Sequence, residues 1–458
     1  MRKIGFVLLL TLLVTGTFAA KSGWVNLFNG KNLDGWKVVN GNAEYKIING
    51  EIVGISVCGS ANSFLATTVN YGDFILEYEM KMEHGLNSGV QIRSISDPNI
   101  KNGRVHGYQV ECDDSQRAWS AGIYDESRRG WLYPMEYNQA SKKAYKKGEW
   151  NSYRVECVGN SIRTWLNGMP CANLVDDMTA SGLIALQVHS IGQNKSEEGK
   201  TVSWRNIRIL TTNLAAERKQ MDASVPEVSY LKNTLTETEK KEGWKLLWDG
   251  KSLEGWIFAK DGAQPSKGWT IQDDELITNL PGNTGGGDIV TKKEYKNFIL
   301  EVDFKFTPGA NGGIKYFIQP NPEGPGYSTI GCEYQILDDK LHPDAKKGIN
   351  GNRTLASLYD LIPANSQQFD PAQSVKRSNG VNQWERARIE VRGEKVIHYL
   401  NGIKIVEYTR GTPEWRALVA TSKFAEVKGF GEYPTGHILL QDHEDEVHYR
   451  NVKIKELK

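Results

Sequence analysis

The segments FILEYEMKM at residues 74–82 and FILEVDFKF at residues 298–306 decide the fold class. Apolar and polar side chains alternate along both segments with a period of two, which is the pattern of a strand with one buried and one solvated face. An Asn-Gly turn signal follows similar runs at residues 167–168 and 401–402, and this dipeptide favours tight hairpins. Many short strands separated by turn signals predict two-sheet β-sandwiches.

These segments belong to an internal repeat that organises the chain. LFNGKNLDGW at residues 27–36 recurs as LWDGKSLEGW at residues 247–256, and further matches follow in the same order, separated by loops of different length. A repeat longer than 200 residues indicates tandem domains and not a solenoid. The sequence therefore predicts an all-β chain with one sandwich at residues 24–211 and a second at residues 243–458, joined by a polar, helix-tolerant linker at residues 212–242.

The second copy carries two insertions that the first copy lacks. One adds 11 residues around residues 341–355, and the other precedes residue 436. The latter contains PEWRALVA at residues 413–420, which we predict to be a short helix opened by Thr412 and Pro413. Long insertions in a compact sandwich are usually rim loops, and binding sites are often built on such rims.

Composition and charge exclude some functions. The 458 residues include 56 Lys and Arg against 55 Asp and Glu, a net charge of +1, and no basic stripe is present; nucleic-acid binding is therefore not expected. The 13 Trp, 19 Tyr and 46 Gly suit a turn-rich β protein with aromatic surfaces. The five cysteines show no metal-binding spacing, which predicts buried thiols, with one disulfide in the first half as the alternative.

The first twenty residues predict a secretory signal. Arg2 and Lys3 precede the apolar run at residues 4–14, and small residues follow up to Ala20. No later segment reaches the roughly 18 uninterrupted apolar residues that a spanning helix needs. We expect an exported protein without a membrane span, periplasmic if the organism is Gram-negative.

Each copy offers a carboxylate, an amide and an imidazole on strands that can line one surface. By strand parity, Glu333 and Gln335 share a face, as do Gln441 and His443. The candidates are Glu333, Gln335, Gln441, His443 and Arg450 in the second copy, and Glu111, Gln109, Gln187, His189 and Arg205 in the first. Imidazole and carboxylate groups transfer protons, and a guanidinium stabilises an oxyanion, so the set suits proton abstraction beside a carbonyl.

Each candidate also has a structural interpretation that the sequence leaves open. The histidines can be hydrogen-bonded groups of the fold, the glutamines scaffolding, and the arginines bridges between two sheets. Tyr124-Asp125 and Tyr359-Asp360 either contact substrate or occupy edge turns.

Signatures of other catalytic classes are absent from the sequence. It has no GxSxG, P-loop, HExxH or EF-hand pattern. The E-x-D-x-x-E pattern of laminarinase-type jelly rolls begins at Glu301 and Asp303 but has Phe306 in the third acidic position, so the retaining two-carboxylate mechanism lacks its basis. No cofactor is predicted; Asp442 beside His443 could bind a divalent ion, but no spacing requires one.

Taken together, the motifs of both copies resemble the 3-keto-disaccharide hydrolase family, which is common in gut Bacteroidetes. The resemblance covers nearly all of residues 24–210 and 243–458. It rests on GCEYQI at 331–336, LYD at 358–360, HYLNG at 398–402, GHILLQDH at 436–443 and YRNV at 449–452, and in the first copy on GYQVE at 107–111, GIYDE at 122–126 and LQVH at 186–189. Cys332, where Tyr is usual, and Glu444, where Gly is usual, depart from the family pattern.

The resemblance implies a concanavalin-like, laminarinase-like jelly roll that cleaves glycosides already oxidised at C3 of the sugar. A C3 ketone acidifies the C2 hydrogen, so a modest base can remove it, and the enolate then expels the C1 leaving group. On this hypothesis His443 (His189) is the base, Glu333 (Glu111) is a base or leaving-group acid, and Arg450 (Arg205) stabilises the enolate oxygen. The remaining polar candidates would bind substrate: Gln335, Gln441, Tyr359 and Asp360, with Gln109, Gln187, Tyr124 and Asp125 in the first copy.

Two other functions stay open at this point. The same sandwich hosts non-catalytic carbohydrate-binding modules, in which Trp119, Trp131 and Tyr133 would stack on sugar rings. The third possibility is a hydrolase of unoxidised glycans. In all three cases the expected partner is a carbohydrate.

Overall fold

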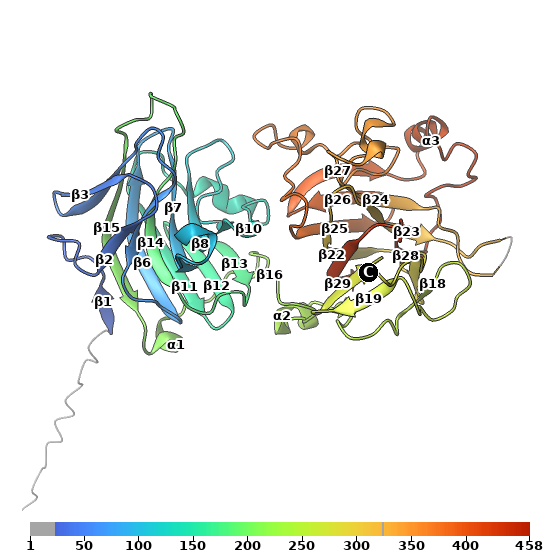
Figure 1. Cartoon of the computed structure of the whole chain (residues 1–458), viewed down its shortest axis with the longest axis horizontal. Coiled ribbons are helices and arrows are strands. Elements are labelled where there is room, and N and C mark those ends of the chain that lie inside the picture. Colours follow the sequence, from blue (N-terminus) through green and yellow to red (C-terminus); the bar gives the residue numbers. More distant parts are fainter. Residues whose placement is uncertain (1–22, 323–324) are drawn as a thin grey trace, which may run out of the picture.

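A computed structural model describes residues 23–322 and 325–458, so the expected signal at residues 1–20 lies outside the described residues. In the described part, four β-sheets form two sandwiches, one blue to green and one yellow to red in Figure 1. The predicted all-β class and the two tandem jelly-roll sandwiches are confirmed. We call the sheet that carries the candidate strand β8 (His106–Asp113) or β24 (Cys332–Leu337) the front sheet of its sandwich, and the other one the back sheet.

The first sandwich has, within the described residues, a nine-stranded back sheet and a seven-stranded front sheet. The back sheet follows the order β16-β13-β12-β11-β6-β15-β4-β3 with β1 paired to β15, and the front sheet the order β10-β9-β8-β7-β14-β5-β2. The back strands are β1 (Trp24–Asn26), β3 (Glu44–Ile48), β4 (Glu51–Ile55), β6 (Phe74–Met82), β11 (Asn151–Val158), β12 (Ser161–Leu166), β13 (Met169–Val175), β15 (Thr201–Leu210) and β16 (Val228–Ser229). The front strands are β2 (Trp36–Val39), β5 (Ser63–Thr67), β7 (Asn87–Ile95), β8 (His106–Asp113), β9 (Ile123–Glu126), β10 (Gly130–Tyr133) and β14 (Leu183–Val188).

The second sandwich repeats this plan with fewer strands in the described residues. The back sheet runs β19-β20-β29-β22-β25-β26-β27 with β17 paired to β29, and the front sheet runs β18-β21-β28-β23-β24. The back strands are β17 (Trp244–Leu246), β19 (Trp269–Gln272), β20 (Glu275–Thr278), β22 (Phe298–Phe306), β25 (Glu385–Arg392), β26 (Lys395–Leu400), β27 (Ile403–Thr409) and β29 (Val447–Glu456). The front strands are β18 (Trp256–Phe258), β21 (Ile289–Thr291), β23 (Asn311–Ile318), β24 (Cys332–Leu337) and β28 (His437–Leu440).

The two strands that predicted the fold differ in how their outward faces are covered. In β6, Leu76, Tyr78 and Met80 are buried while the intervening polar residues are half-buried, as the alternation predicts. In β22 nearly every residue is buried, including Glu301 and Asp303. The expected solvated face of residues 298–306 is therefore wrong. The physical reason is that the linker packs over this face and that Lys453, Arg386 and Arg388 neutralise the two carboxylates.

The segment expected as a linker docks on both sandwiches. It contains α1 (Leu214–Glu217), β16, which pairs in parallel with β13, and α2 (Glu237–Lys241), which begins with a Thr236–Glu239 capping box. The Arg386 guanidinium of the second copy lies 3.9 Å from the ring centroid of Tyr230 in this segment. The chain therefore joins the two copies through packed contacts rather than through a free tether.

The predicted turns and the predicted insertion helix are present. Asn167 and Gly168, like Asn401 and Gly402, adopt left-handed backbone conformations, as a tight hairpin of this type requires. The helix α3 (Pro413–Ala420) begins where Thr412 accepts a hydrogen bond from the Trp415 N–H at 3.1 Å. The short 3₁₀ turns are η1 (Lys101–Gly103), η2 (Gln139–Lys143), η3 (Pro343–Lys346) and η4 (Ser366–Gln368).

Two further features concern the cysteines and the helices. All five cysteines are free thiols, four of them buried and Cys58 half-buried, so the alternative disulfide in the first half is not formed. No helix within residues 23–322 and 325–458 has the length and apolar character to cross a membrane.

Candidate active site

A cavity of about 350 Å³ opens on the front sheet of the second sandwich. Its floor comes from alternate residues of the adjacent antiparallel strands β23 and β24. Its wall comes from the part of the second insertion that follows α3. The polar residues that line it include Asn311, Lys315, Glu333, Gln335, Tyr359, Lys423, Gln441 and His443, and Phe424 and Val427 add apolar surface. The structure thus brings Glu333, Gln335, Gln441 and His443 together. Strand parity places Glu333 and Gln335 there, whereas Gln441 and His443 lie in the loop that follows β28.

Glu333 is the buried carboxylate of this cavity. Lys315 lies opposite it in the register of β23 and β24, and the Lys315 ammonium lies 3.8 Å from Glu333 Oε2. Burial raises the pKa of Glu333 above its ordinary value, against the lowering effect of Lys315 and Lys423. A carboxylate with a raised pKa is a stronger base than a solvated one, which suits proton transfer.

The backbone leaves room for this carboxylate only because residue 313 is glycine. A Cβ on Gly313 would lie 2.3 Å from Glu333 Oε1 and 3.1 Å from Gln441 Oε1. Any side chain there would push the carboxylate out of its place across the sheet. The small residue therefore positions Glu333.

Two lysines give the cavity a positive potential. The Lys315 ammonium donates to the Thr329 carbonyl at 2.9 Å. Lys423 comes from the insertion after α3, and its ammonium lies 4.1 Å from the ring centroid of Tyr359. Burial lowers the pKa of Lys423, with Glu333 acting in the opposite direction. Preorganised cations of this kind stabilise negative charge that develops on a bound molecule.

Tyr359 and Asp360 have different places. Tyr359 lines the cavity and donates a hydrogen bond to Asp344 at 2.7 Å. Asp360 is buried behind it, where its carboxylate accepts from Arg353 Nε at 2.5 Å and from the Lys423 N–H at 2.8 Å. Asp360 therefore positions the insertion rather than lining the cavity.

His443 lies at the exposed rim of the cavity, next to Gln441, whose Oε1 is buried without a hydrogen-bond partner. The neighbouring Asp442 accepts a hydrogen bond from the Gly287 N–H at 2.7 Å and another from the Asn279 amide. The described residues contain no group of three His, Cys, Asp or Glu that could hold a metal ion. Asp442 thus holds its loop against Asn279 and Gly287 through these hydrogen bonds, and we assign no metal site to it.

The two arginines predicted to stabilise an oxyanion are not in the cavity, so that prediction is wrong. Arg450 lies on β29 of the back sheet, 4.0 Å from the Trp384 ring centroid and 3.6 Å from Asp303. Arg205 lies on β15, also in a back sheet, 4.0 Å from the Trp150 ring and 2.6 Å from Glu79. The last strand of each copy joins the sheet opposite the candidate strands, so these side chains serve the scaffold.

The strand register also corrects the pairing of the two copies. In the second copy Lys315 faces Glu333 and Gly313 faces Gln335, whereas in the first Gln91 faces Gln109 and Gly89 faces Glu111. The residue in the place of Glu333 is therefore Gln109, and the residue in the place of Lys315 is Gln91. Glu111 occupies the place of Gln335, so equating Glu111 with Glu333 is wrong.

The corresponding side chains of the first copy form a chain of hydrogen bonds. Ser94 donates to Gln91 at 2.7 Å, Gln91 to Gln109 at 2.6 Å, and Gln109 to Glu111 at 2.9 Å. Asn87 donates to the other Glu111 oxygen at 2.6 Å. Burial raises the pKa of Glu111 to about 7, although Arg117 lowers it. Each member of the chain is thus held by its neighbour.

The other first-copy candidates are dispersed. Gln187 is fully buried and both polar atoms of its amide lack a partner, whereas His189 is exposed and bonded to the Ser190 carbonyl. Tyr124 packs edge-on against Trp131 at 5.3 Å. Asp125 is fully buried and pairs with Arg128 and Arg129 at 2.6 Å each, which is a structural role.

Two of the three aromatic residues considered for sugar stacking are inaccessible. Trp119 and Tyr133 are fully buried, and only Trp131 is partly exposed. A stacking platform made of these three residues is therefore wrong.

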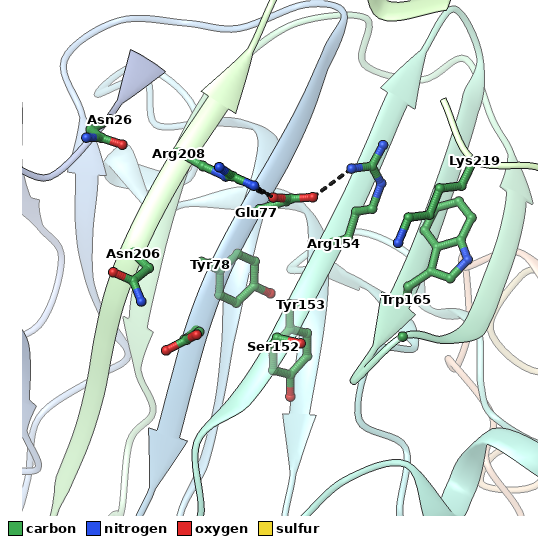
Figure 2. A pocket seen from close by; sticks show the side chains of 12 residues that line it. Asn26, Glu77, Tyr78, Ser152, Tyr153, Arg154, Trp165, Asn206, Arg208 and Lys219 are labelled. Carbon is green, nitrogen blue, oxygen red and sulfur yellow. Dashed lines mark hydrogen bonds and ion pairs between the residues drawn. The ribbon is translucent and has the colours of Figure 1, made fainter. Parts of the chain in front are cut away.

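A larger hollow of about 520 Å³ lies over the back sheet of the first sandwich. Figure 2 shows its ion pairs, in which Glu77 lies between Arg208 and Arg154. The Glu77–Arg154 and Glu77–Arg208 contacts measure 2.7 and 2.5 Å. Glu77, Arg154 and Arg208 are thus engaged with one another in ion pairs within this hollow.

The sequence interpretation missed the lysines. Lys315 could have been found from strand parity, because it shares a face with Asn311 and Gly313 and faces Glu333. Lys423 had no such signal, since it reaches the cavity only through the fold of the insertion.

The fold and the cavity define a jelly-roll protein with a polar site of small-molecule size on one front sheet. The chain belongs to the family described as the 3-keto-alpha-glucoside-1,2-lyase-like domain, which matches residues 23–210 and 243–455. The predicted family resemblance is thereby confirmed for both copies.

Comparison with known proteins gives the following similarities. The chain is 36% identical over 240 residues to a 3-keto-disaccharide hydrolase of Bacteroides thetaiotaomicron, covering 47% of this chain and 79% of that protein. A solved structure of a candidate glycosyl hydrolase from Parabacteroides distasonis is 30% identical, with a TM-score of 0.43, over 50% of this chain and all of that one. The carbohydrate-binding module CBM66 of Bacillus subtilis is 17% identical, with a TM-score of 0.27, over 38% of this chain and 94% of that one.

Proposed function

We propose that the second copy cleaves the glycosidic bond of 3-keto-glycosides by removing the C2 proton and eliminating the C1 substituent. The observation that carries this proposal is the buried Glu333 carboxylate, with its raised pKa, beside the ammonium groups of Lys315 and Lys423 in one cavity. The family of the chain and its 36% identical relative, a 3-keto-disaccharide hydrolase, support a carbohydrate-cleaving role.

In the first step the C2–H bond breaks and the proton passes to Glu333. The electron pair of that bond delocalises onto the C3 carbonyl oxygen, which becomes an enolate. Lys315 and Lys423 take the role first expected of Arg450, because their positive charges lie in the cavity and favour the enolate over the ketone.

In the second step the enolate electrons form a C1–C2 double bond and the C1–O bond breaks. The departing oxygen takes a proton from His443, whose exposed position at the rim suits a leaving group that extends into solvent. Gln335, Gln441 and Tyr359 would bind sugar hydroxyls. Water that later adds to the enone would complete a net hydrolysis.

The test compares a matched pair of substrates on the full chain. We expect aglycone release from a nitrophenyl 3-keto-glucoside and none from the same glucoside with an intact C3 hydroxyl. Deuterium at C2 of the keto substrate should slow release several-fold if proton abstraction limits the rate. Equal turnover of the unoxidised glucoside would instead show direct glycoside hydrolysis, and saturable binding without turnover would show a binding module.

Export belongs to the same proposal. Residues 1–20 have the sequence of a secretory signal, which would place the enzyme where extracellular glycosides arrive. We propose a periplasmic or secreted location on this basis.

A further inference from the structure

A crevice of about 690 Å³ lies between the two copies, separate from the cavity of the second copy. Most of its lining comes from the first copy, and Ala372 and Arg377 come from the second. Its acidic and basic residues are His84, Asp113, Asp114, Arg117, Lys147 and Arg377.

The carboxylates of the crevice already have basic partners. Asp113 accepts a hydrogen bond from Arg117 Nε at 2.9 Å. Asp114 lies 2.5 Å from His84 Nδ1 and 3.6 Å from Lys147 Nζ. Among the described residues, the guanidinium of Arg377 makes no ion pair, and its Nε is buried without a hydrogen bond. The nearby carboxylate that acts on it, Asp113, is already paired with Arg117. Arg377 is therefore the crevice cation without an ion pair of its own among the described residues.

Arg377 is also held close to a second guanidinium. Arg117 and Arg377 lie 4.5 and 5.1 Å from the ring centroid of Trp119. Burial lowers the pKa of Arg377, the positive charge of Arg117 lowers it further, and Asp113 acts in the opposite direction. The positive charge of Arg117 near Arg377 favours an anion at the Arg377 guanidinium, and a guanidinium fork matches a carboxylate with two parallel hydrogen bonds.

We propose that this crevice binds a carboxylate-bearing sugar, with its carboxylate on Arg377 and its hydroxyls against polar side chains of the first copy. Asn87, Ser115 and Gln116 supply amide and hydroxyl groups in the lining. The crevice is large enough for a sugar ring and far larger than a simple inorganic anion requires. Because it includes residues of both copies, the site exists only in the paired arrangement. It does not depend on the turnover proposed for the second copy.

The experiment titrates the full chain with glucuronate and with glucose by calorimetry. Glucuronate should bind saturably and at least tenfold more tightly than glucose. Arg377→Gln should weaken glucuronate binding at least tenfold, and Arg377→Lys, which keeps the charge, should weaken it less. Arg392→Gln is the matched control, because Arg392 is exposed and pairs with Glu390 away from the crevice. Thermal unfolding of each variant checks that it is folded.

Three results would overturn the proposal: glucose binding as tightly as glucuronate, unchanged glucuronate binding in folded Arg377→Gln, or sulfate binding as tightly as glucuronate, since the last would show an anion site without sugar recognition. Lys423→Gln separates the two sites, because it removes a cation from the cavity of the second copy. Glucuronate binding should persist in this variant, whereas its loss would place the ligand in the cavity of the second copy.

Discussion

The two copies keep one sheet geometry and fill it with different chemistry. Where the second copy has the facing pair Lys315 and Glu333, the first has Gln91 and Gln109. A charged pair that can transfer a proton is thus replaced by two amides that cannot do so at neutral pH.

The surroundings of the two pairs also differ: they form an open cavity in the second copy and a hydrogen-bonded chain in the first. In the second copy the insertion after α3 adds Lys423 and an apolar wall, and a cavity opens beside Glu333. In the first copy the amides hydrogen-bond one another and Glu111 in a closed chain. Both copies therefore keep the same scaffold, while in the described residues the reactive groups converge in the second copy.

Removing one carboxylate from each copy should affect the two copies very differently. Glu333→Gln should reduce turnover of a 3-keto-glycoside by about 10²–10⁴-fold, because general-base catalysis contributes that much. Glu111→Gln should leave turnover within about twofold, since Glu111 occupies the place of Gln335 and faces no lysine on the adjacent strand. Initial rates under kcat/KM conditions measure both.

Equal losses in the two variants would show that both copies catalyse the reaction. Full activity in Glu333→Gln would remove Glu333 from the mechanism. Circular dichroism of both variants excludes unfolding as the cause of a loss.

The stability of the first copy should depend on pH through the buried carboxyl group of Glu111. Glu111 titrates at a pKa of about 7 in the folded chain against an ordinary value of 4.5, so between these values the folded state binds more protons than the unfolded state. The stability contributed by protonated Glu111 is therefore present below pH 4.5 and is lost as the pH rises through 7, by about 3 kcal/mol. Denaturant unfolding of the first copy at a series of pH values measures this loss.

Glu111→Gln should remove most of this pH dependence, because the glutamine stays neutral. Burial also raises the pKa of Glu385 in the second copy to about 7. Glu385→Gln is therefore the matched variant, and its effect should appear in the unfolding of the second sandwich. An unchanged pH slope in Glu111→Gln would show that Arg117 and the amides hold the Glu111 carboxylate ionised.

Most of the fold could be predicted because its signals are local. Alternation over residues 74–82, the Asn-Gly turns and the Thr412-Pro413 helix start each depend on a few neighbouring residues, and the repeat added the domain plan. Burial of the polar face of β22 could not be predicted, because the linker that covers it is distant in sequence.

The site was predictable only where strand parity decides it. Parity places Glu333 with Gln335 on one face, but it does not say which sheet a strand joins, and this is why Arg450 was misplaced. Glu111 was equated with Glu333 because both are glutamates. Counting from the glycine that starts GYQVE at 107–111 and GCEYQ at 331–335 instead aligns Gln109 with Glu333. Lys423 depends on how an insertion folds back, for which short-range patterns carry no information.

The smallest expected effect concerns His443, the proposed proton donor, and uses the corresponding histidine of the first copy as its control. His443→Ala should slow release of a sugar or alkyl leaving group by about 10²-fold, because such an alkoxide needs a proton as it departs. Release of nitrophenolate, which is stable as an anion, should slow only a few-fold. His189→Ala is the matched control, since His189 is exposed and bonded to the Ser190 carbonyl, and it should change neither rate. An equal loss for both leaving groups would instead make His443 the base at C2, because that step precedes departure and does not depend on the acidity of the leaving group.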